Sequence, residues 1–310
     1  MQNISENHKM IVISDKKKGG LPFSKGILAN SIIITGLDMF VSHKIASDVQ
    51  EYLLKNEMTF ISLDELRALV FRFIKDEVNI EFAEKYLLWQ SVGKLKKPLI
   101  VLIGGSTGAG KSTIANIISG RLNISRIVST DAIREIMRTS VSDKLIRPLR
   151  GSSYNAYKHL SLPPTGVNPV ILGFREQVMA VNVGVEAIIK RSVEEKLDTI
   201  IEGAHLVPGY LDKSNYEKKA IIEQFVVIVE NEDLHREHFI KRTYETQGSR
   251  PVKKYLRYLD NIRLIQSYIK ELATKNKIRI IDNYSLDYAV IAIMEQLFSR
   301  VKKEFSSHIS

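Results

Sequence analysis

The sequence predicts an α/β protein, in which a five-stranded parallel sheet with helices on both faces is preceded by a small, mainly helical domain. Three observations favour this fold. After Pro98, short β-branched runs alternate with helical stretches, which is typical of a parallel sheet covered by helices. Before it, apolar residues recur at helical spacing. Between the two parts, Gly93 is followed by a basic run, as expected where a helix ends and a new domain begins.

The length and composition support two folded domains. At ~150 residues per domain, the 310 residues suggest about two, and we predict a helical domain at 9–93, a linker at 94–98 and a sheet domain at 99–305. The 44% hydrophobic and 26% charged residues exclude a disordered or fibrous chain. No apolar run reaches the ~20 residues that cross a bilayer, and the start does not resemble a signal peptide. We therefore expect a cytoplasmic protein that makes no use of a membrane.

The charge balance points to an anionic partner. Lys and Arg number 45 against 35 Asp and Glu, which gives a formal net charge of +10. Such a field attracts nucleic acid, acidic membrane surfaces or phosphorylated small molecules, without distinguishing among them. The chain has no cysteine, which excludes disulfides, thiolate metal ligands and a cysteine nucleophile.

The elements of the first domain follow from helical periodicity. A short strand is expected at Ile11–Ser14, and helices are expected at 26–35, 40–55, 62–75 and 80–90. Ser62 and Glu65 have the spacing of a capping box, which predicts the start of the third helix.

The second domain shows five apolar runs that predict strands. They are Leu99–Ile103, Arg126–Ser129, Thr199–Ile201, Phe225–Val229 and Arg279–Ile281. The stretch Arg147–Pro169 contains four prolines, so we expect an irregular excursion there.

The strongest motif follows the first of these strands. Residues 105–112 read Gly-Ser-Thr-Gly-Ala-Gly-Lys-Ser and fit G-x-x-x-x-G-K-[ST], with a strand before them and an expected helix, Thr113–Arg121, after them. The glycines let backbone N–H groups surround a phosphate at a helix N-terminus. Lys111 would bridge the outer phosphates, and the Ser112 hydroxyl would bind Mg²⁺. The expected nucleotide-binding residues are Gly105, Ser106, Thr107, Gly108, Ala109, Gly110, Lys111, Ser112 and Thr113.

Two further strands are followed by acidic residues. Asp131 comes after the second strand and Glu202 after the third. Ligands of open parallel sheets bind beyond the carboxyl ends of the strands, so both carboxylates are expected beside the terminal phosphate. Asp131 would orient or deprotonate an acceptor hydroxyl, with a helix N-cap as the alternative. Glu202 would hold Mg²⁺-bound water or share the role of base, with an ordinary loop carboxylate as the alternative.

Cations near these acids outline an acceptor site and a lid. Arg134 and Arg138 share one helix face with Asp131. The helix Leu234–Tyr244 and the basic stretch after it resemble a lid that closes over transferring phosphates, although a solvated helix face is the alternative for each single cation. His205 is as compatible with core packing as with substrate contact. No N-K-x-D segment for reading guanine is present, which favours transfer to a small acceptor over a GTPase.

Four stretches together resemble the archaeal 2-phosphoglycerate kinases, namely 104–113, 129–138, 173–178 and 201–209. The segments 21–28, 46–49, 61–66 and 83–88 resemble the ATP-cone module that precedes the kinase domain in that family. The run Lys16-Lys17-Lys18-Gly19-Gly20 departs from the module, which usually has a Lys-Arg pair before one Gly. Nucleotide binding by this domain and a role in packing or oligomerisation alone therefore both stay open.

The resemblance implies a P-loop kinase-like sheet domain and ATP-dependent phosphorylation of the 3-hydroxyl of 2-phosphoglycerate. The product would be 2,3-bisphosphoglycerate, on the route to cyclic 2,3-diphosphoglycerate, with ATP and Mg²⁺ as cofactors. The resemblance implies catalytic roles for Lys111, Asp131, Glu202 and Arg242, metal binding by Ser112 and Glu202, nucleotide contact by Arg250, and substrate binding by Arg134, Arg138, Arg175 and His205.

Two other functions stay open at this point. A kinase of the same fold could act on another small anionic alcohol. A nucleotide-gated nucleic-acid-binding protein would suit the net charge, but it is disfavoured because the cations are dispersed and are not interleaved with aromatic side chains. The sequence leaves open whether the chain forms a homo-oligomer.

Overall fold

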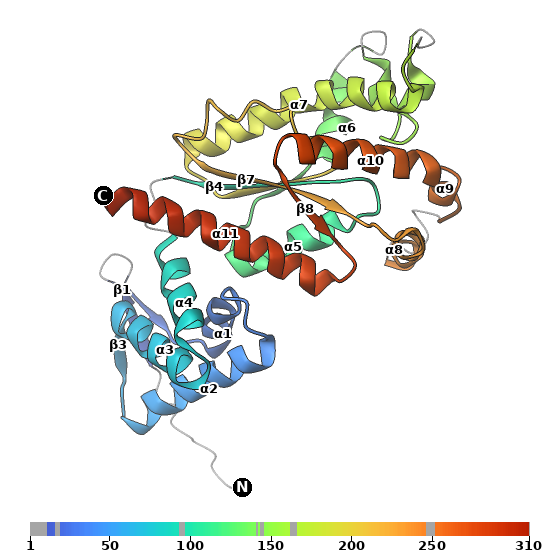
Figure 1. Cartoon of the computed structure of the whole chain (residues 1–310). Coiled ribbons are helices and arrows are strands. Elements are labelled where there is room, and N and C mark those ends of the chain that lie inside the picture. The colour runs from blue at the N-terminus through green and yellow to red at the C-terminus, as the bar shows by residue number, and fades with distance from the viewer. Residues whose placement is uncertain are drawn as a thin grey trace, which may run out of the picture. The chain divides into compact units, whose positions relative to one another are not determined.

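The computed structural model describes residues 11–15, 19–92, 97–140, 142, 146–161, 166–245 and 252–309 (Figure 1). The chain divides into two compact units, Met1–Leu95 with Lys302–Ser310, and Lys96–Val301. The run Lys16–Lys18, most of the predicted linker at 94–98, and Arg250 lie outside the described residues.

The first unit combines four helices with a small sheet. The helices are α1 (Lys25–Ile33), α2 (Met39–Lys55), α3 (Leu63–Glu77) and α4 (Ile80–Val92), which confirms the predicted four. The sheet has β1 (Val12–Asp15) in its centre, antiparallel to β2 (Gly19–Pro22) and parallel to β3 (Phe60–Ser62). The sequence did not predict β2 and β3, because a four-residue Gly-Gly-Leu-Pro segment and a three-residue strand are too short to show alternation.

Side-chain caps fix where the helices of this unit begin. The Ser62 hydroxyl accepts a hydrogen bond from the Glu65 N–H, and the Glu65 carboxylate accepts one from the Ser62 N–H at 2.9 Å, which confirms the predicted capping box. Asp38 caps α2 by accepting from the Val41 N–H at 2.9 Å. The apolar faces of the helices meet in a core that includes the fully buried Ile32 and Ile45.

The second unit is built on a five-stranded sheet with the order β5-β6-β4-β7-β8. All neighbouring strands are parallel, as predicted. The strands are β4 (Leu99–Gly104), β5 (Ile127–Ser129), β6 (Thr199–Glu202), β7 (Ile221–Ile228) and β8 (Arg279–Asp282). β7 begins four residues before the prediction, because Glu223 and Gln224 interrupt its apolar pattern; Glu223 is paired there with Arg300 at 3.2 Å.

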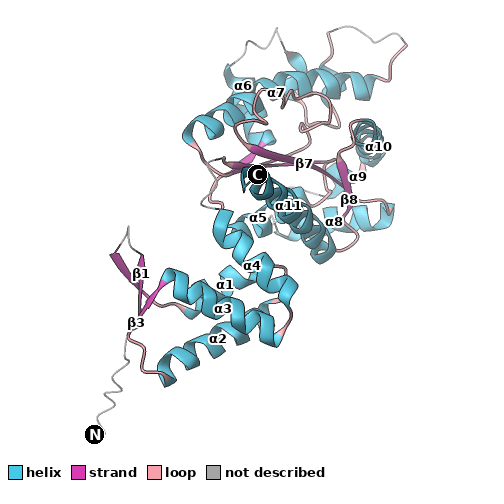
Figure 2. Cartoon of the chain, turned by 60° about the vertical axis from the view of Figure 1, so that its left-hand side comes forward, coloured by secondary structure: helices cyan, strands magenta, loops and turns pink. Residues whose placement is uncertain are grey.

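Helices cover both faces of this sheet (Figures 1 and 2). On one face lie α6 (Thr130–Ser140), α7 (Pro169–Glu195) and α10 (Leu259–Lys275); on the other lie α5 (Lys111–Leu122) and α11 (Leu286–Ile309). Successive side chains of β4 point to opposite faces of the sheet, toward the two helix layers. Ile100 and Leu102 pack with α7 residues such as Val181 in one core.

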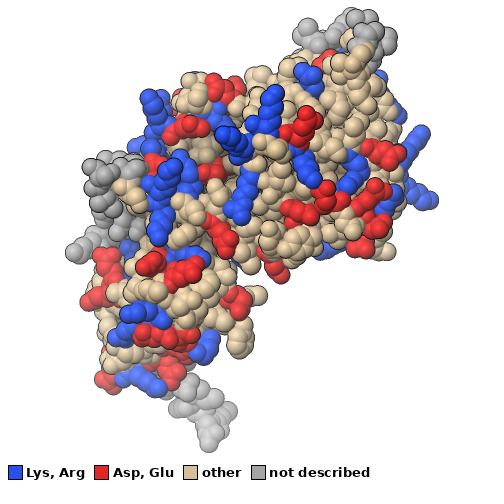
Figure 3. All heavy atoms as spheres, in the orientation of Figure 1, with Lys and Arg blue, Asp and Glu red and all other residues tan. Residues whose placement is uncertain are grey.

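The remaining elements lie near the carboxyl ends of the strands. The predicted irregular excursion contains two short 3₁₀ turns, η1 (Arg147–Arg150) and η2 (Ala156–His159), before α7 begins at Pro169. After β7 come α8 (Glu232–Glu245) and α9 (Val252–Leu256). Within the described part of the chain, no helix is both long and apolar enough to cross a bilayer. Basic and acidic side chains are interspersed on the face in Figure 3, which fits the dispersed cations of the sequence.

Candidate active site

A cavity of about 540 Å³ lies at the carboxyl ends of the sheet strands. Its walls come from the loop after β4, the ends of β5 and β6, the helix α8 and the segment after β8. The structure therefore brings together side chains that lie far apart in the sequence. The predicted site residues that line this cavity are Thr107, Gly108, Gly110, Lys111, Ser112, Thr113, Asp131, Glu202 and Arg242.

The loop after β4 has the backbone geometry of a phosphate cradle. Gly105, Gly108 and Gly110 have φ values of +139°, +85° and +86°, which side-chain-bearing residues rarely adopt. The first N–H groups of an α-helix have no intrahelical partner, and in α5 the N-cap residue, Gly110, offers no side-chain acceptor for them. These donors, at the positive end of the helix dipole, favour an anion.

Two buried side chains, those of Gln266 and Asn283, support this loop through hydrogen bonds. The Ser106 hydroxyl donates to Oε1 of Gln266 at 3.1 Å, and the same oxygen accepts from the Val229 N–H at 3.1 Å. Asn283, after β8, donates through Nδ2 to the Ala109 carbonyl at 3.0 Å. Ser106 and Ala109 are therefore buried supports of the cradle and do not line the cavity.

Lys111 lies at the floor of the cavity. Its ammonium donates to the Ser106 carbonyl at 2.7 Å, and its side chain is buried. Burial lowers the pKa of Lys111, while the nearby carboxylates of Glu202 and Asp131 act in the opposite direction. A phosphate group in the cradle would supply further negative charge to this ammonium.

The two candidate acids come from neighbouring strands. Glu202 ends β6, paired in register between Ser129 of β5 and Ile103 of β4. Asp131 lies in the first turn of α6, which begins at Thr130, and its own N–H donates to the Ser129 hydroxyl at 3.2 Å. The alternative role of Asp131 as the N-cap is therefore wrong, and its carboxylate lines the cavity.

The donor set of the cavity suits a hard divalent cation. The Ser112 hydroxyl and the Glu202 carboxylate both line the cavity, and Mg²⁺ prefers oxygen ligands of this kind. Over the residues that the structure describes, no cluster of three or more His, Asp or Glu side chains could hold a metal without other ligands. The residues therefore fit Mg²⁺ that shares its ligands with nucleotide phosphates and water.

His205 lies in the core, which corrects its assignment to substrate binding. It is fully buried, donates through Nε2 to Gln177 at 3.0 Å and accepts at Nδ1 from the Thr130 hydroxyl at 2.8 Å. The Gln177 amide group donates to the carbonyls of Pro148 and Gly151, which leaves its oxygen for the imidazole. Burial lowers the pKa of His205 to about 4, so this imidazole is neutral at pH 7.

The arginines assigned to the acceptor do not line the cavity. Arg134 donates to the carbonyls of Leu149 and Gly151, at 2.9 and 3.1 Å. Arg138 pairs with Glu135 on the exposed face of α6. Arg175 is exposed on α7, where its charge lowers the pKa of Tyr268 against a larger effect of burial. Arg134 and Arg138 therefore have other partners, and Arg175 is exposed on α7 outside the cavity lining.

Several cavity residues were not among the predicted site residues. His238 of α8 lines the cavity, and Asn283 and Tyr284 line it from the segment after β8. Lys241, which belongs to the helix predicted as a lid but had no assigned role, lines it beside Arg242. The pattern His235, His238 and Arg242 places three side chains on one face of α8 at spacings of three and four. That pattern could have indicated His238, although it also occurs on ordinary surface helices.

The fold and the cavity define a class of protein. A phosphate cradle between the central strand and α5, with carboxylates on the two neighbouring strand ends and cations from α8, is the arrangement of a P-loop kinase, an enzyme that transfers a phosphoryl group from a nucleoside triphosphate.

Comparison with known proteins then gives the family. The chain is 38% identical over 282 residues to the 2-phosphoglycerate kinase of Methanothermobacter thermautotrophicus, covering 91% of this chain and 92% of that one. It is 37% identical over 289 residues to the 2-phosphoglycerate kinase of Pyrococcus horikoshii, covering 93% and 94%. The chain belongs to the 2-phosphoglycerate kinase family.

Two other comparisons also gave matches. The Zeta toxin family model matches residues 87–143, which include the phosphate cradle and Asp131. A solved structure of shikimate kinase from Aquifex aeolicus aligns with a TM-score of 0.34 and 17% identity, over 64% of this chain and 96% of that chain.

Proposed function

We propose that this kinase transfers the γ-phosphoryl group of ATP to the 3-hydroxyl of 2-phosphoglycerate and so forms 2,3-bisphosphoglycerate. The observation that carries the proposal is the meeting of Lys111, Asp131 and Glu202 in one cavity beside a phosphate cradle. The names of the archaeal relatives support 2-phosphoglycerate as the acceptor.

In the proposed reaction, the acceptor oxygen bonds to the γ-phosphorus while the bond from that phosphorus to the β,γ-bridging oxygen breaks. ADP leaves, and the hydroxyl proton passes to a carboxylate of the cavity. Asp131 is the better-placed base, because 71% of its side chain is exposed, whereas Glu202 is 7% exposed. Loop N–H groups, Lys111 and Arg242 stabilise the charge on the transferring oxygens.

The proposed cofactors are ATP and Mg²⁺. Ser112 and Glu202 would hold the cation, which neutralises charge on the phosphate oxygens when it is bound. Arg250 remains a proposed nucleotide contact. A place in cyclic 2,3-diphosphoglycerate synthesis, a cytoplasmic location and a homo-oligomeric state also remain predictions.

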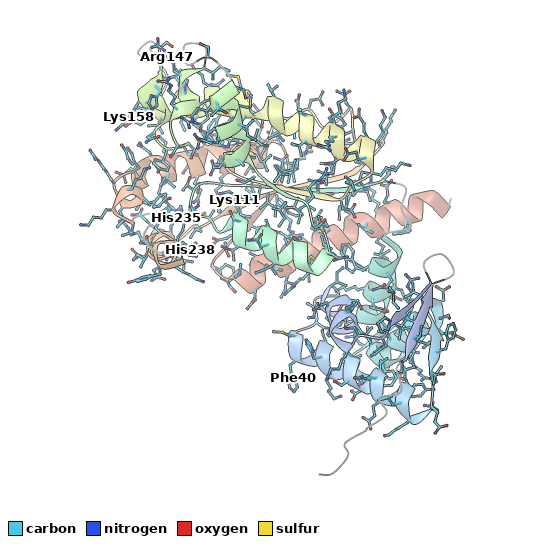
Figure 4. The ribbon with its side chains drawn as sticks, turned by 180° about the vertical axis from the view of Figure 1, so that it is seen from behind. Phe40, Lys111, Arg147, Lys158, His235 and His238 are labelled. Carbon is cyan, nitrogen blue, oxygen red and sulfur yellow. The ribbon has the colours of Figure 1, made fainter. Side chains whose placement is uncertain are left out.

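An anionic acceptor needs cationic side chains beside it, but the arginines assigned to the acceptor from the sequence do not line the cavity. Lys241 and Arg242 of α8 line the cavity and are proposed to bind anionic groups of the acceptor or the donor. Figure 4 shows Arg147 and Lys158 on the part of the unit that carries η1 and η2. Lys158 donates to the Tyr258 hydroxyl at 2.6 Å, so it already has a partner away from the cavity.

For the first unit, we propose an ATP-cone-like domain at 9–93 that binds a nucleotide. The support is its resemblance to that module in segments such as 21–28 and 61–66. A role in packing alone is the alternative. The stoichiometry of nucleotide binding distinguishes between the two.

The test of the acceptor is ATP consumption with 2-phosphoglycerate, 3-phosphoglycerate and glycerate in parallel, with the product identified by phosphorus NMR. We expect turnover with 2-phosphoglycerate and two phosphate monoester signals in its product. Turnover with only a different anionic alcohol would keep the kinase class and replace the acceptor.

A further inference from the structure

Two histidines of α8 bond to the backbone of the phosphate cradle. Nε2 of His235 lies 2.8 Å from the carbonyl oxygen of Thr107, and Nδ1 of His238 lies 3.0 Å from that of Gly108 (Figure 4). A carbonyl oxygen can only accept a hydrogen bond, so each imidazole donates. The two rings lie three residues apart on a helix and therefore share one face.

The contact between α8 and the cradle is tight. His235 is fully buried and its ring stacks on Phe239, with centroids 5.1 Å apart. Phe239 stacks in turn on Tyr255, at 4.8 Å. Gly108 faces both the Phe239 ring and His235 so closely that a Cβ at position 108 would overlap the Phe239 ring. The helix therefore packs directly on the loop backbone.

The two bonds set the direction of consecutive peptide groups. In a planar trans peptide, the C=O and the following N–H point to opposite sides. Holding the Thr107 oxygen toward His235 therefore points the Gly108 N–H away from His235, within the same peptide plane. Holding the Gly108 oxygen toward His238 does the same for the Ala109 N–H, which donates to the Ser106 carbonyl at 3.4 Å.

The same helix carries cations into the cavity. Lys241 and Arg242 line the cavity, and the Arg242 guanidinium lies over the ring of Tyr255 at 5.7 Å from its centroid. Arg242 follows His238 by about one helical turn, a rise of ~6 Å. Because an α-helix is stiff over one turn, bonds that fix His238 on the cradle also fix the distance between the cradle and Arg242.

We propose that His235 and His238 are positioning residues for phosphoryl transfer. Through their N–H groups they orient the peptides of the cradle, and through α8 they hold Arg242 at a set distance from the bound phosphates. The inference rests on the proposed function for its reaction, but its effect on the cradle is measurable with nucleotide alone.

A crossed pair of substitutions tests whether the donors act this way. The amide nitrogen of Gln can take the place of imidazole Nε2, and that of Asn the place of Nδ1. His235→Gln and His238→Asn therefore keep the donor, whereas His235→Asn and His238→Gln remove it. The matched control at each position is the other amide, which is equally polar.

The readouts are the Kd for ADP by calorimetry, and the kcat and KM for ATP. We expect the donor-removing variants to bind ADP about three- to tenfold more weakly, as expected for one lost hydrogen bond, with a lower kcat as well. The donor-keeping variants should stay within about twofold of the native protein. Equal Kd and kcat for Asn and Gln at both positions would overturn the proposal.

Folding is checked by circular dichroism and thermal unfolding of each variant. Should the buried His235 tolerate neither amide, the half-buried His238 pair decides the proposal alone. A native protein that binds ADP and turns over no 2-phosphoglycerate would remove the proposed acceptor, while the ADP affinities of the variants would still decide the role of the histidines.

Discussion

The two carboxylates of the cavity sit in different surroundings. The Asp131 side chain is 71% exposed at the start of α6, whereas Glu202 is 7% exposed at the end of β6. A hydroxyl that enters from solvent reaches Asp131 first. Glu202 lies deeper, and its charge acts on the Lys111 ammonium. This difference in depth is the reason that Asp131 is the proposed proton acceptor, with Glu202 proposed to lie beside the phosphates.

Asp131→Asn should separate nucleotide binding from phosphoryl transfer. The substitution keeps the shape and the exposed position but removes the proton acceptor, so we expect kcat to fall by about 10²- to 10⁴-fold. The Kd for ATP should change by less than about threefold. Steady-state kinetics and calorimetry measure the two quantities. A nearly native kcat would transfer the role of base away from Asp131.

The buried His205 leads to a prediction about how the stability of the protein depends on pH. Its pKa is about 4 in the folded protein against 6.5 ordinarily, because the fold buries it. Between these pH values the unfolded chain binds a proton that the native state excludes, so stability is full above pH 6.5 and falls toward pH 4. The loss is on the order of 3 kcal/mol.

Urea unfolding of the native protein and of His205→Gln at several pH values checks this effect. The variant should be less stable at pH 7.5, because the Thr130 hydroxyl loses its partner, and its stability should depend less steeply on pH below 6.5. Parallel pH curves for the two proteins would assign the acid sensitivity to other groups, such as the buried His235.

Residues of the cradle could be predicted because their spacing is local and the geometry follows from three glycines within six positions. How deeply each side chain is buried could not be predicted from the sequence. His205 follows Glu202 by three residues, yet it turns into the core toward Thr130 and Gln177. Arg134 reaches a turn about 15 residues later in the chain, a contact that no spacing within α6 reveals.

At the scale of elements, α10 holds the cradle through a single side chain. Gln266 accepts from the Ser106 hydroxyl and from the Val229 N–H, and it donates to the Val229 carbonyl at 2.9 Å. It therefore joins the loop after β4 to the end of β7.

Gln266→Leu should loosen this junction while it keeps the volume. We expect the free energy of unfolding to fall by about 1–3 kcal/mol and the KM for ATP to rise, because the Ser106 hydroxyl and the Val229 N–H lose their acceptor, whereas the Val229 carbonyl keeps Arg263. Gln266→Glu keeps an acceptor for Ser106 and should recover part of the affinity. Denaturant unfolding and steady-state kinetics measure both effects. Unchanged values for the leucine variant would show that the junction is not needed.

The strands of the large sheet could be predicted because buried parallel strands are continuous apolar runs, as in Leu99–Ile103. The exception is the start of β7, where Glu223 interrupts the run and pairs with Arg300 of a distant helix. The sheet β2-β1-β3 depends on pairing between segments about 45 residues apart, which is not visible in either segment alone.

At the scale of the whole molecule, the two units raise the question of how many nucleotides the chain binds. We expect two nucleotides per native chain and one per Lys111→Ala chain, because the substitution removes a phosphate ligand from the cavity but leaves the first unit intact. Calorimetry with a non-hydrolysable ATP analogue measures the stoichiometry.

A matched control for this measurement is Lys97→Ala, outside both the cavity and the first unit, which should keep two sites. A single site in the native protein, lost in Lys111→Ala, would leave the first unit without a nucleotide and favour its role in packing or oligomerisation.

The network around His205 extends beyond the reacting groups. Gln177 supports the turn at Pro148 and Gly151, and His205 links Gln177 to Thr130, the residue before Asp131. Two residues beyond that turn, the Ser153 hydroxyl lies 3.2 Å from the Thr107 hydroxyl. Because these hydrogen bonds join the 148–153 segment to the residue before Asp131 and to the cradle, a substitution at Gln177 is expected to disturb several parts of the cavity wall at once, even though Gln177 itself is buried.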